Sequence, residues 1–294
     1  MPGAWSRFFR VRLLPTAISN LLLGMFLAAH GEGELEWLRV SLALPLAAFL
    51  YLLGMGMNDL HDRERDRTLH PERPLATEAL PVKRAELALR WLVLGCVALA
   101  ACLDVVSLIL TLVLLAWISL YNLVTKDRPF LGPATMGLVR STLVLLGAAA
   151  ATAGPAFPAR VWLAAVLVGG YVALLTFYSM EEERARPRAL RFRLALISVE
   201  LLLAAGLTLW ETGIDRTSLL AWSLPLLWCL IYAARPLRDV PPRASAVTFQ
   251  LLLGLFPLDL AMLLSYDLVI PASFCVGLWL LAWRPLLKTK KAEL

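Results

Sequence analysis

The sequence predicts an all-α fold: a polytopic membrane helical bundle of nine to ten transmembrane helices around a central cavity open to the cytoplasmic side. Of the 294 residues, 60% are hydrophobic and the mean hydropathy is +0.72, whereas a soluble domain is usually about 45–50% apolar. Apolar runs of about 17–25 residues, long enough to cross a bilayer, recur along the chain. Basic residues gather in alternate connections between these runs. We therefore expect residues 1–294 to form a single transmembrane domain.

Ten apolar runs follow one another, and the last two are interrupted by Pro257, Asp259 and Asp267. The first run is long and lacks a small-residue cleavage site after it, so it is expected to remain as a membrane helix rather than to be removed as a signal peptide. The runs cover roughly residues 11–30, 37–57, 86–103, 105–123, 134–153, 161–178, 194–210, 217–234, 244–265 and 269–286.

The basic residues indicate how these runs are oriented. Most of the 28 Lys and Arg residues fall at the chain ends and in the connections that lie on the same side as the N-terminus. The opposite connections contain only Arg39, Arg160 and Arg216. Basic residues collect on the cytoplasmic side of membrane proteins. Both termini are therefore predicted to be cytoplasmic, and the net charge of +6 reflects this topology rather than a nucleic-acid partner.

A polar stretch from Asn58 to Asp66 follows the second apolar run. On a helix, Asn58, Asp62 and Asp66 are spaced at i, i+4 and i+8, which places their oxygens along one stripe. Mg²⁺ prefers oxygen ligands and typically binds one or two protein carboxylates together with substrate phosphate. The stretch therefore predicts a magnesium site at the end of a membrane helix.

Arginines accompany these acidic residues. Arg63, Arg67 and Arg73 lie beside or just after the carboxylates, and guanidinium groups match the oxygens of phosphate. Acidic, basic and metal-binding groups together indicate diphosphate chemistry. The alternative is a solvated extension of the helix, stabilised by weak pairs such as Asp59 with Arg63. The position at a membrane boundary favours the diphosphate interpretation.

The run Asn-Asp-x-x-Asp-x-x-x-Asp with a downstream Arg-Pro-Leu resembles the first aspartate-rich motif of the UbiA superfamily of intramembrane prenyltransferases. The resemblance implies that this motif holds Mg²⁺ bound to the diphosphate of an isoprenoid donor, with catalytic roles for Asp62 and Asp66. It also implies an integral protein of a bacterial cytoplasmic membrane. The matching residues are Asn58, Asp59, Asp62, Asp66, Arg73 and Pro74.

Two further basic residues stand near apolar runs. Lys126, which follows Tyr121 by five residues, resembles the family's basic residue that meets the donor diphosphate; the alternative is an interfacial aromatic ring with a lysine that extends to the membrane surface. Arg140 lies midway into the fifth run, where a charge costs several kcal/mol and usually faces an interior cavity. It is a substrate-binding candidate, and the alternative is an ion pair with Glu200.

The sixth run ends where the family places its second motif, Asp-x-x-x-Asp, and here Ser179 and Glu183 occupy the matching positions. Serine is a weaker Mg²⁺ ligand than a carboxylate, although Glu181 to Glu183 offer further oxygens. This departure is similar to the divergent EboC-like branch of the family. Tyr121 and Tyr178, both at helix ends, are expected to place ring faces near the developing allylic cation.

Polar side chains within other runs suggest additional lining of the cavity. Thr16 and Asn20 share one face of the first run by their i,i+4 spacing, either to line a pocket or to form interhelical hydrogen bonds. Asp259 is a charge within the ninth run and is expected to face the central cavity.

The expected function is transfer of a prenyl group from a prenyl diphosphate to an aromatic or other lipophilic acceptor within the lipid bilayer, with Mg²⁺-dependent ionisation of the donor. A non-catalytic protein that binds or transports isoprenoid lipids is an alternative, since the second motif departs from the family. A CDP-alcohol phosphotransferase is disfavoured because its Asp-Gly-x-x-Ala-Arg signature is missing. A plain transporter would use Arg140 and Asp259 but would leave the carboxylates of the loop unexplained.

Overall fold

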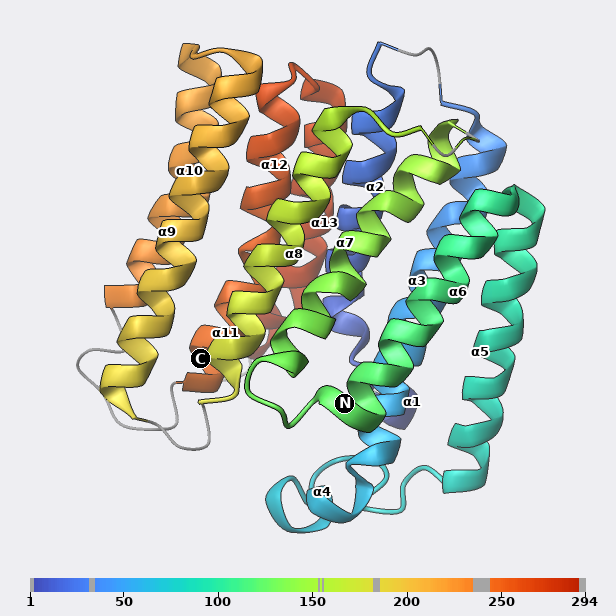
Figure 1. Cartoon of the computed structure of the whole chain (residues 1–294). Helices are drawn as coiled ribbons and strands as arrows, with labels where there is room; N and C mark the ends of the chain where they lie inside the picture. Colours follow the sequence, from blue (N-terminus) through green and yellow to red (C-terminus); the bar gives the residue numbers. More distant parts are fainter. Residues whose placement is uncertain are drawn as a thin grey trace.

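Helices form all of the regular secondary structure in the computed structural model, which describes residues 3–31, 35–152, 154, 156–181, 186–234 and 244–290 (Figure 1). Glu183 lies outside these described residues. The helices are α1 (Ala4–Phe8), η1 (Val11–Leu13), α2 (Leu14–Ala29), α3 (Trp37–His61), α4 (Arg63–Leu69), α5 (Val82–Leu103), α6 (Val105–Leu120), η2 (Tyr121–Thr125), α7 (Leu131–Thr152), α8 (Ala159–Ser179), α9 (Pro187–Thr212), α10 (Arg216–Ala234), α11 (Ala244–Leu253), α12 (Leu255–Ser265) and α13 (Val269–Lys290).

The predicted membrane spans are largely confirmed. Within the described ranges, eight helical segments are long and apolar enough to cross a membrane, and two further apolar helices, Arg216–Ile231 and Val269–Trp283, are shorter. These two coincide with the predicted runs at 217–234 and 269–286. The eight segments are Val11–Ala29, Trp37–His61, Val82–Leu103, Val105–Thr125, Leu131–Thr152, Ala159–Ser179, Arg188–Thr212 and Ala246–Ser265.

Two helices begin at residues that favour a helix start, either by capping a backbone N–H or by lacking one. Asp104 has an extended backbone between α5 and α6, and its carboxylate accepts a hydrogen bond from the backbone N–H of Ser107 at 2.7 Å. This is the usual contact of an N-terminal cap. The ninth run divides at Gly254 into α11 and α12, and Pro257 stands in the first turn of α12, where its missing N–H costs nothing.

Helices α2 and α7 form the seam of the bundle. One apolar cluster packs α2, α7 and α8 against α9, α10 and α12, and a second packs α2 and α7 against α3, α5 and α6. At the crossing of α2 and α7, a Cβ on Gly24 would lie 1.9 Å from the carbonyl oxygen of Val144, and a Cβ on Gly147 would lie 2.0 Å from that of Leu21. Glycine at both positions lets the backbones approach closely, as is common between membrane helices.

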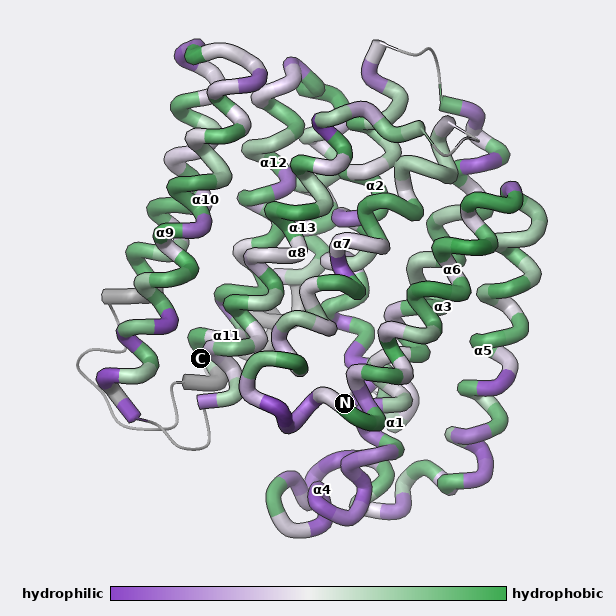
Figure 2. Tube along the Cα trace, viewed as in Figure 1, coloured by the Kyte–Doolittle hydropathy of each residue, from purple (hydrophilic) through white to green (hydrophobic). Residues whose placement is uncertain are grey.

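Polar residues concentrate at the two ends of the bundle (Figure 2). At the end away from α4, Arg39 fixes several helices together: Nε donates to the carbonyl oxygen of Ala150 at 2.6 Å, and the guanidinium also pairs with Asp104. At the other end lie α1, α4 and the connection between α6 and α7 (Figure 1). This second end, which we call the polar end, contains the predicted diphosphate motif.

Candidate active site

The predicted single helix through Asn58, Asp62 and Asp66 is wrong. Helix α3 ends at His61, α4 begins at Arg63, and Asp62 joins them with φ −80° and ψ 0°. The hydrogen bond from the Asp62 N–H to the Asn58 carbonyl is kept at 3.0 Å, so these two side chains stay neighbours, with Asn58 Nδ2 3.4 Å from Asp62 Oδ2. Of the three residues in the predicted stripe, only Asn58 and Asp62 therefore remain side by side, at the end of α3.

Asp66 is engaged differently. Its side chain is buried, and its Oδ2 accepts a hydrogen bond from Nη1 of Arg73 at 2.5 Å. The same Arg73 atom lies 3.6 Å from Oδ1 of Asp59, which is only 3% exposed. Arg73 thus joins two buried carboxylates of the motif, and its expected contact with a donor diphosphate stays a prediction. Among the described residues, no three Asp, Glu, His or Cys side chains converge as a metal-binding group.

Arg10 is a site residue that the sequence analysis missed. Its Nη2 donates to Asp59 Oδ1 at 2.6 Å, and its carbonyl oxygen accepts a hydrogen bond from the Tyr51 hydroxyl at 2.9 Å. Its backbone adopts the left-handed conformation, with φ 44°, between α1 and η1. Few non-glycine residues adopt this conformation, and nothing in the local sequence signals it, so Arg10 counted only as one of the basic residues of the topology.

Lys126 pairs with Asp62, and a local change of helix type brings it there. Residues Tyr121–Thr125 form a π-helical turn, in which the Lys126 N–H donates to the Tyr121 carbonyl at 3.0 Å. Such turns rotate the residues that follow and are frequent at functional sites. The ammonium group of Lys126 contacts the carboxylate of Asp62 on α3. The acidic motif and the basic residue 64 positions away thus meet, whereas the expected contact of Lys126 with a donor diphosphate stays a prediction.

Arg67 lies elsewhere. Its Nη1 donates to Glu64 at 2.6 Å, and Glu64 also accepts hydrogen bonds from Arg63. The bond from Arg63 lowers the pKa of the exposed Glu64 carboxyl, so this acid stays ionised and keeps both arginines on the outer face of α4. The side chain of Arg67 is 52% exposed. The weak surface pairing that we considered as an alternative describes Arg63 and Arg67, whereas the carboxylates of the motif pair with other residues.

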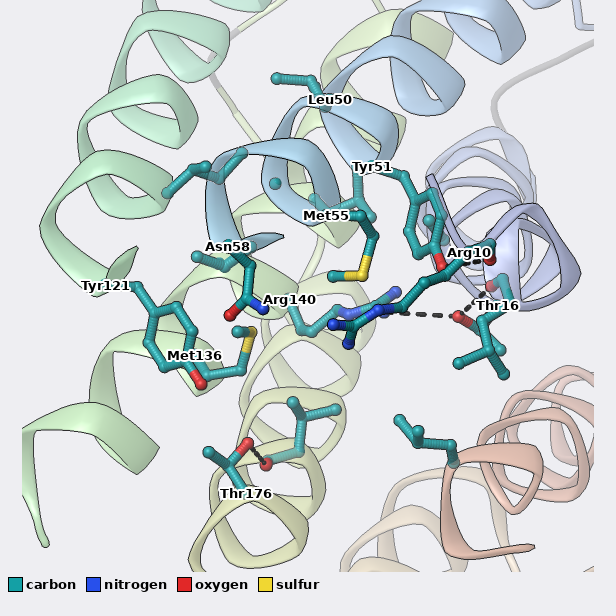
Figure 3. A pocket seen from close by; sticks show the side chains of 18 of the residues that line it. Arg10, Thr16, Leu50, Tyr51, Met55, Asn58, Tyr121, Met136, Arg140 and Thr176 are labelled. Carbon is teal, nitrogen blue, oxygen red and sulfur yellow. Dashed lines mark hydrogen bonds between the residues drawn. The ribbon is translucent and has the colours of Figure 1, made fainter. Parts of the chain in front are cut away.

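A cavity of about 350 Å³ lies next to this charged cluster (Figure 3). Arg10, Asn58, Tyr121 and Ser179 line it from helix ends at the polar end, and Arg140 projects into it from α7. The remaining walls are mostly apolar and come from η1, α2, α3, α6, α7, α8 and α11; they include Leu13, Leu50, Met55, Leu114, Ile118, Met136, Leu143, Val172, Leu175 and Leu252.

The two tyrosines predicted to lie near the allylic cation are placed differently. Tyr121 lines the cavity. Tyr178 is fully buried in the larger apolar cluster and is not among the residues that line the cavity. A helix turns by about 100° per residue, so Ser179, which does line the cavity, and its neighbour Tyr178 point in different directions.

The end of α8 carries the residues that differ from the family's second motif. Ser179 faces the cavity, and its hydroxyl donates to the carbonyl oxygen of Thr176 at 2.9 Å. Glu181 is fully buried, with Arg193 at 2.8 Å and Arg186 also bonded to its carboxylate. These arginines occupy oxygens that we considered as metal ligands. Glu181 therefore ties the end of α8 to the start of α9.

The ion pair between Arg140 and Glu200, which we considered as an alternative, does not form. Arg140 donates from Nη1 to Asn20 Oδ1 at 3.1 Å and from Nη2 to Thr16 Oγ1 at 3.3 Å. The Glu200 carboxylate accepts no hydrogen bond from any described residue. Asp259, which we expected to face the cavity, is instead fully buried behind Asn20. Tertiary packing alone places these residues, since they come from α2, α7, α9 and α12.

Solved structures share this fold at low sequence identity. The apo structure of a UbiA homolog from Aeropyrum pernix K1 superimposes with a TM-score of 0.65 at 20% identity, covering 90% of this chain and 99% of the other. A digeranylgeranylglyceryl phosphate synthase gives 0.63 at 17% identity, covering 90% and 97%. A UbiA homolog from Archaeoglobus fulgidus, bound to GPP and Mg²⁺, gives 0.58 at 16% identity, covering 87% and 99%.

A search of curated proteins found no match. The model of the UbiA prenyltransferase family, however, matches residues 17–265, which include the acidic motif, the π-helical turn and every cavity-lining residue except Arg10, Leu13 and Thr16. The match is to the family as a whole, so the EboC-like assignment stays a prediction. Because the match extends over most of the sequence and the solved UbiA homologues share its fold, this chain belongs to the UbiA prenyltransferase family.

Proposed function

We propose that this protein transfers a prenyl group from a prenyl diphosphate to a lipophilic acceptor within the membrane. The observation that carries the proposal is the junction of a charged cluster with an apolar cavity inside a membrane bundle. The diphosphate of the donor would bind at the polar end, and its hydrocarbon chain would lie in the cavity between the helices. The Archaeoglobus fulgidus homologue, solved with GPP and Mg²⁺ and with DMAPP and Mg²⁺, supports a donor of this class.

The cations at the polar end would bind the diphosphate. Arg10, Arg73 and Lys126 come from three separate parts of the chain, and each contacts a carboxylate of the acidic motif. These carboxylates hold the three cations in place before the donor arrives. Preorganised cations stabilise the negative charge that develops on a departing group. Arg67, on the outer face of α4, is replaced by Arg10 in this proposal.

The residues at this end also suit Mg²⁺. The amide oxygen of Asn58 and the carboxylate of Asp62 are hard oxygen ligands on neighbouring side chains, and Asn58 lines the cavity. We propose these two residues as the metal ligands, with Asp59 and Asp66 fixing Arg10 and Arg73. When bound, Mg²⁺ neutralises diphosphate charge and makes it a better leaving group.

The proposed reaction breaks the bond between C1 of the allylic chain and the diphosphate oxygen, and the electron pair leaves with the diphosphate. The acceptor forms a bond to C1 and loses a proton, which a basic oxygen of the released diphosphate can accept. The ring of Tyr121 lines the cavity and is available to stabilise the allylic cation through its face. The apolar walls exclude water and so suppress hydrolysis of the donor.

The end of α8 favours a second candidate function, a non-catalytic protein that binds isoprenoid lipids. Ser179 stands where the family has a carboxylate, and two arginines occupy Glu181. Such a protein would bind prenyl diphosphates in a Mg²⁺-dependent way without releasing diphosphate. Binding and release are therefore measured together.

The test uses the purified protein in lipid nanodiscs, prenyl diphosphates of several chain lengths and a lipid extract as acceptor. We expect diphosphate release that requires both Mg²⁺ and the acceptor and that stops when EDTA removes the metal. Tight Mg²⁺-dependent donor binding without release, for every donor and extract, would instead support the binding protein. Absence of donor binding would contradict both candidate functions.

A separate prediction concerns Ser179. Ser179→Asp adds a carboxylate to the cavity wall at the end of α8, so we expect half-maximal activity at a lower Mg²⁺ concentration, by about tenfold for one added charged ligand. The measurement is a Mg²⁺ titration of diphosphate release at saturating donor. Ser179→Asn, similar in shape but uncharged, is the control. Identical titration curves for the two variants and the wild type would show that this part of α8 contributes nothing to metal binding.

A further inference from the structure

A chain of buried polar side chains runs from the cavity wall into the protein. Arg140 donates to Asn20 Oδ1 at 3.1 Å, and Nδ2 of the same Asn20 donates to Asp259 Oδ2 at 2.9 Å and to Oδ1 at 3.1 Å. Ser19 also donates to Asp259, at 2.5 Å. Ser19, Asn20 and Asp259 are each 0% exposed, whereas Arg140 is partly exposed and lines the cavity (Figure 3).

The amide of Asn20 is the group that allows this arrangement. A carboxylate only accepts hydrogen bonds and a guanidinium only donates them, so a side chain with one donor and one acceptor can join the two. The acid is therefore set back behind the amide, and the base faces the cavity. No described carboxylate forms an ion pair with Arg140, and its hydrogen bonds occupy only part of its donors.

Arg140 enters the same cavity as Arg10 of the charged cluster, but from a backbone position deeper in the bundle (Figure 3). It is nine residues beyond Leu131, the first residue of α7, which corresponds to about 13 Å along the axis. Asn58, Tyr121 and Ser179 line the cavity from the ends of α3, η2 and α8. A charge kept among apolar walls at membrane depth is expensive and is usually functional. An oxyanion in the cavity would complete its interactions.

We infer that Arg140 is an oxyanion subsite for the acceptor, and that Asp259 acts through Asn20 as the positioning residue that aims the guanidinium into the cavity. The acceptor, or its head group, then carries a carboxylate or a phosphate. This inference rests on the proposed function, because it assigns the acceptor of that reaction. Its test measures binding alone, so the acceptor subsite and the proposed catalysis can each be contradicted without the other.

The test compares three small probes of similar shape: 4-butylbenzoate, 4-butylphenyl phosphate and the neutral 4-butylbenzamide. Their binding to the protein in nanodiscs is followed by calorimetry and by thermal stabilisation. Hydrogen bonds to a charged group contribute about 1.5–3 kcal/mol, so we expect one of the anions to bind about tenfold or more tightly than the amide. The stronger anion identifies the class of head group.

Variants separate the roles of the residues. Arg140→Met should abolish the preference for the anion, and Asp259→Asn should reduce it severalfold while leaving benzamide binding unchanged. Glu200→Gln is the matched control, because it neutralises another acid within a membrane helix that has no hydrogen bond to this chain of residues, and it should keep the full preference. If Asp259→Asn does not fold, Asn20→Leu, whose side chain branches at the same carbon but cannot form hydrogen bonds, breaks the same connection.

Equal affinity of the wild type for anions and amide, or saturable binding of neither anion, would overturn the subsite even if Mg²⁺-dependent diphosphate release is observed. An anion preference that is lost in Arg140→Met but unchanged in both Asp259→Asn and Asn20→Leu would overturn the positioning role of Asp259. An intact preference without diphosphate release would leave the subsite standing and contradict the proposed catalysis.

Discussion

Asp62→Ala is expected to lower Mg²⁺-dependent diphosphate release by about 100-fold or more. Asp62 joins α3 to α4, lies beside Asn58 and pairs with Lys126. Its removal takes away the proposed metal-binding carboxylate and leaves Lys126 without its partner. The rate is measured in nanodiscs at saturating donor over a range of Mg²⁺ concentrations, and the apparent melting temperature shows whether the variant is folded.

Glu64→Ala is the matched control for this experiment. Glu64 lies two residues further along the chain, is exposed and forms ion pairs with Arg63 and Arg67 on the surface. Its removal should leave the rate unchanged. Full activity of a folded Asp62→Ala protein would contradict the assignment of the site, whereas a loss in both variants would show that α4 as a whole, rather than the Asp62 carboxylate, is required.

Gly147→Ala is expected to have the largest effect on stability. A Cβ at Gly147 would lie 2.0 Å from the carbonyl oxygen of Leu21, a backbone atom that cannot rotate away. Helices α2 and α7 must therefore separate, which corresponds to overpacking that costs about 1–3 kcal/mol. We expect the apparent melting temperature in detergent to fall by about 5 °C or more. The same change at Gly24, 1.9 Å from the carbonyl of Val144, should act in the same direction.

Gly206→Ala, in α9, serves as the control, because a Cβ at Gly206 would have no atom within 4 Å. Alanine is the better helix former by about 1 kcal/mol, so this variant should be at least as stable as the wild type. Equal melting temperatures for Gly147→Ala and Gly206→Ala would show that α2 and α7 do not approach as closely as described. Thr16 and Arg140 lie on these two helices, so separation should also impair the site.

Some of the site could be predicted because its signal is local. Asn58 and Asp62 are four residues apart, and helical spacing alone keeps them adjacent even though α3 ends between them. Lys126 was identified by its resemblance to the family's basic residue at the end of the fourth apolar run, and the structure brings it to Asp62. The end of α3 at His61 was not foreseen, since helix ends inside a charged stretch have little sequence signal.

The sequence was enough to predict a membrane protein, the approximate positions of its helices and the stretch that carries the acidic motif. These properties depend on composition, on the length of apolar runs and on spacings within one helix. Tertiary structure alone decided that Arg10 replaces Arg67 beside the carboxylates, that Tyr178 is in the core, and that Asn20 separates Asp259 from Arg140. Asn20 and Asp259 are 239 residues apart in the chain, and their contact depends on how α2 packs against α12, which no local pattern encodes.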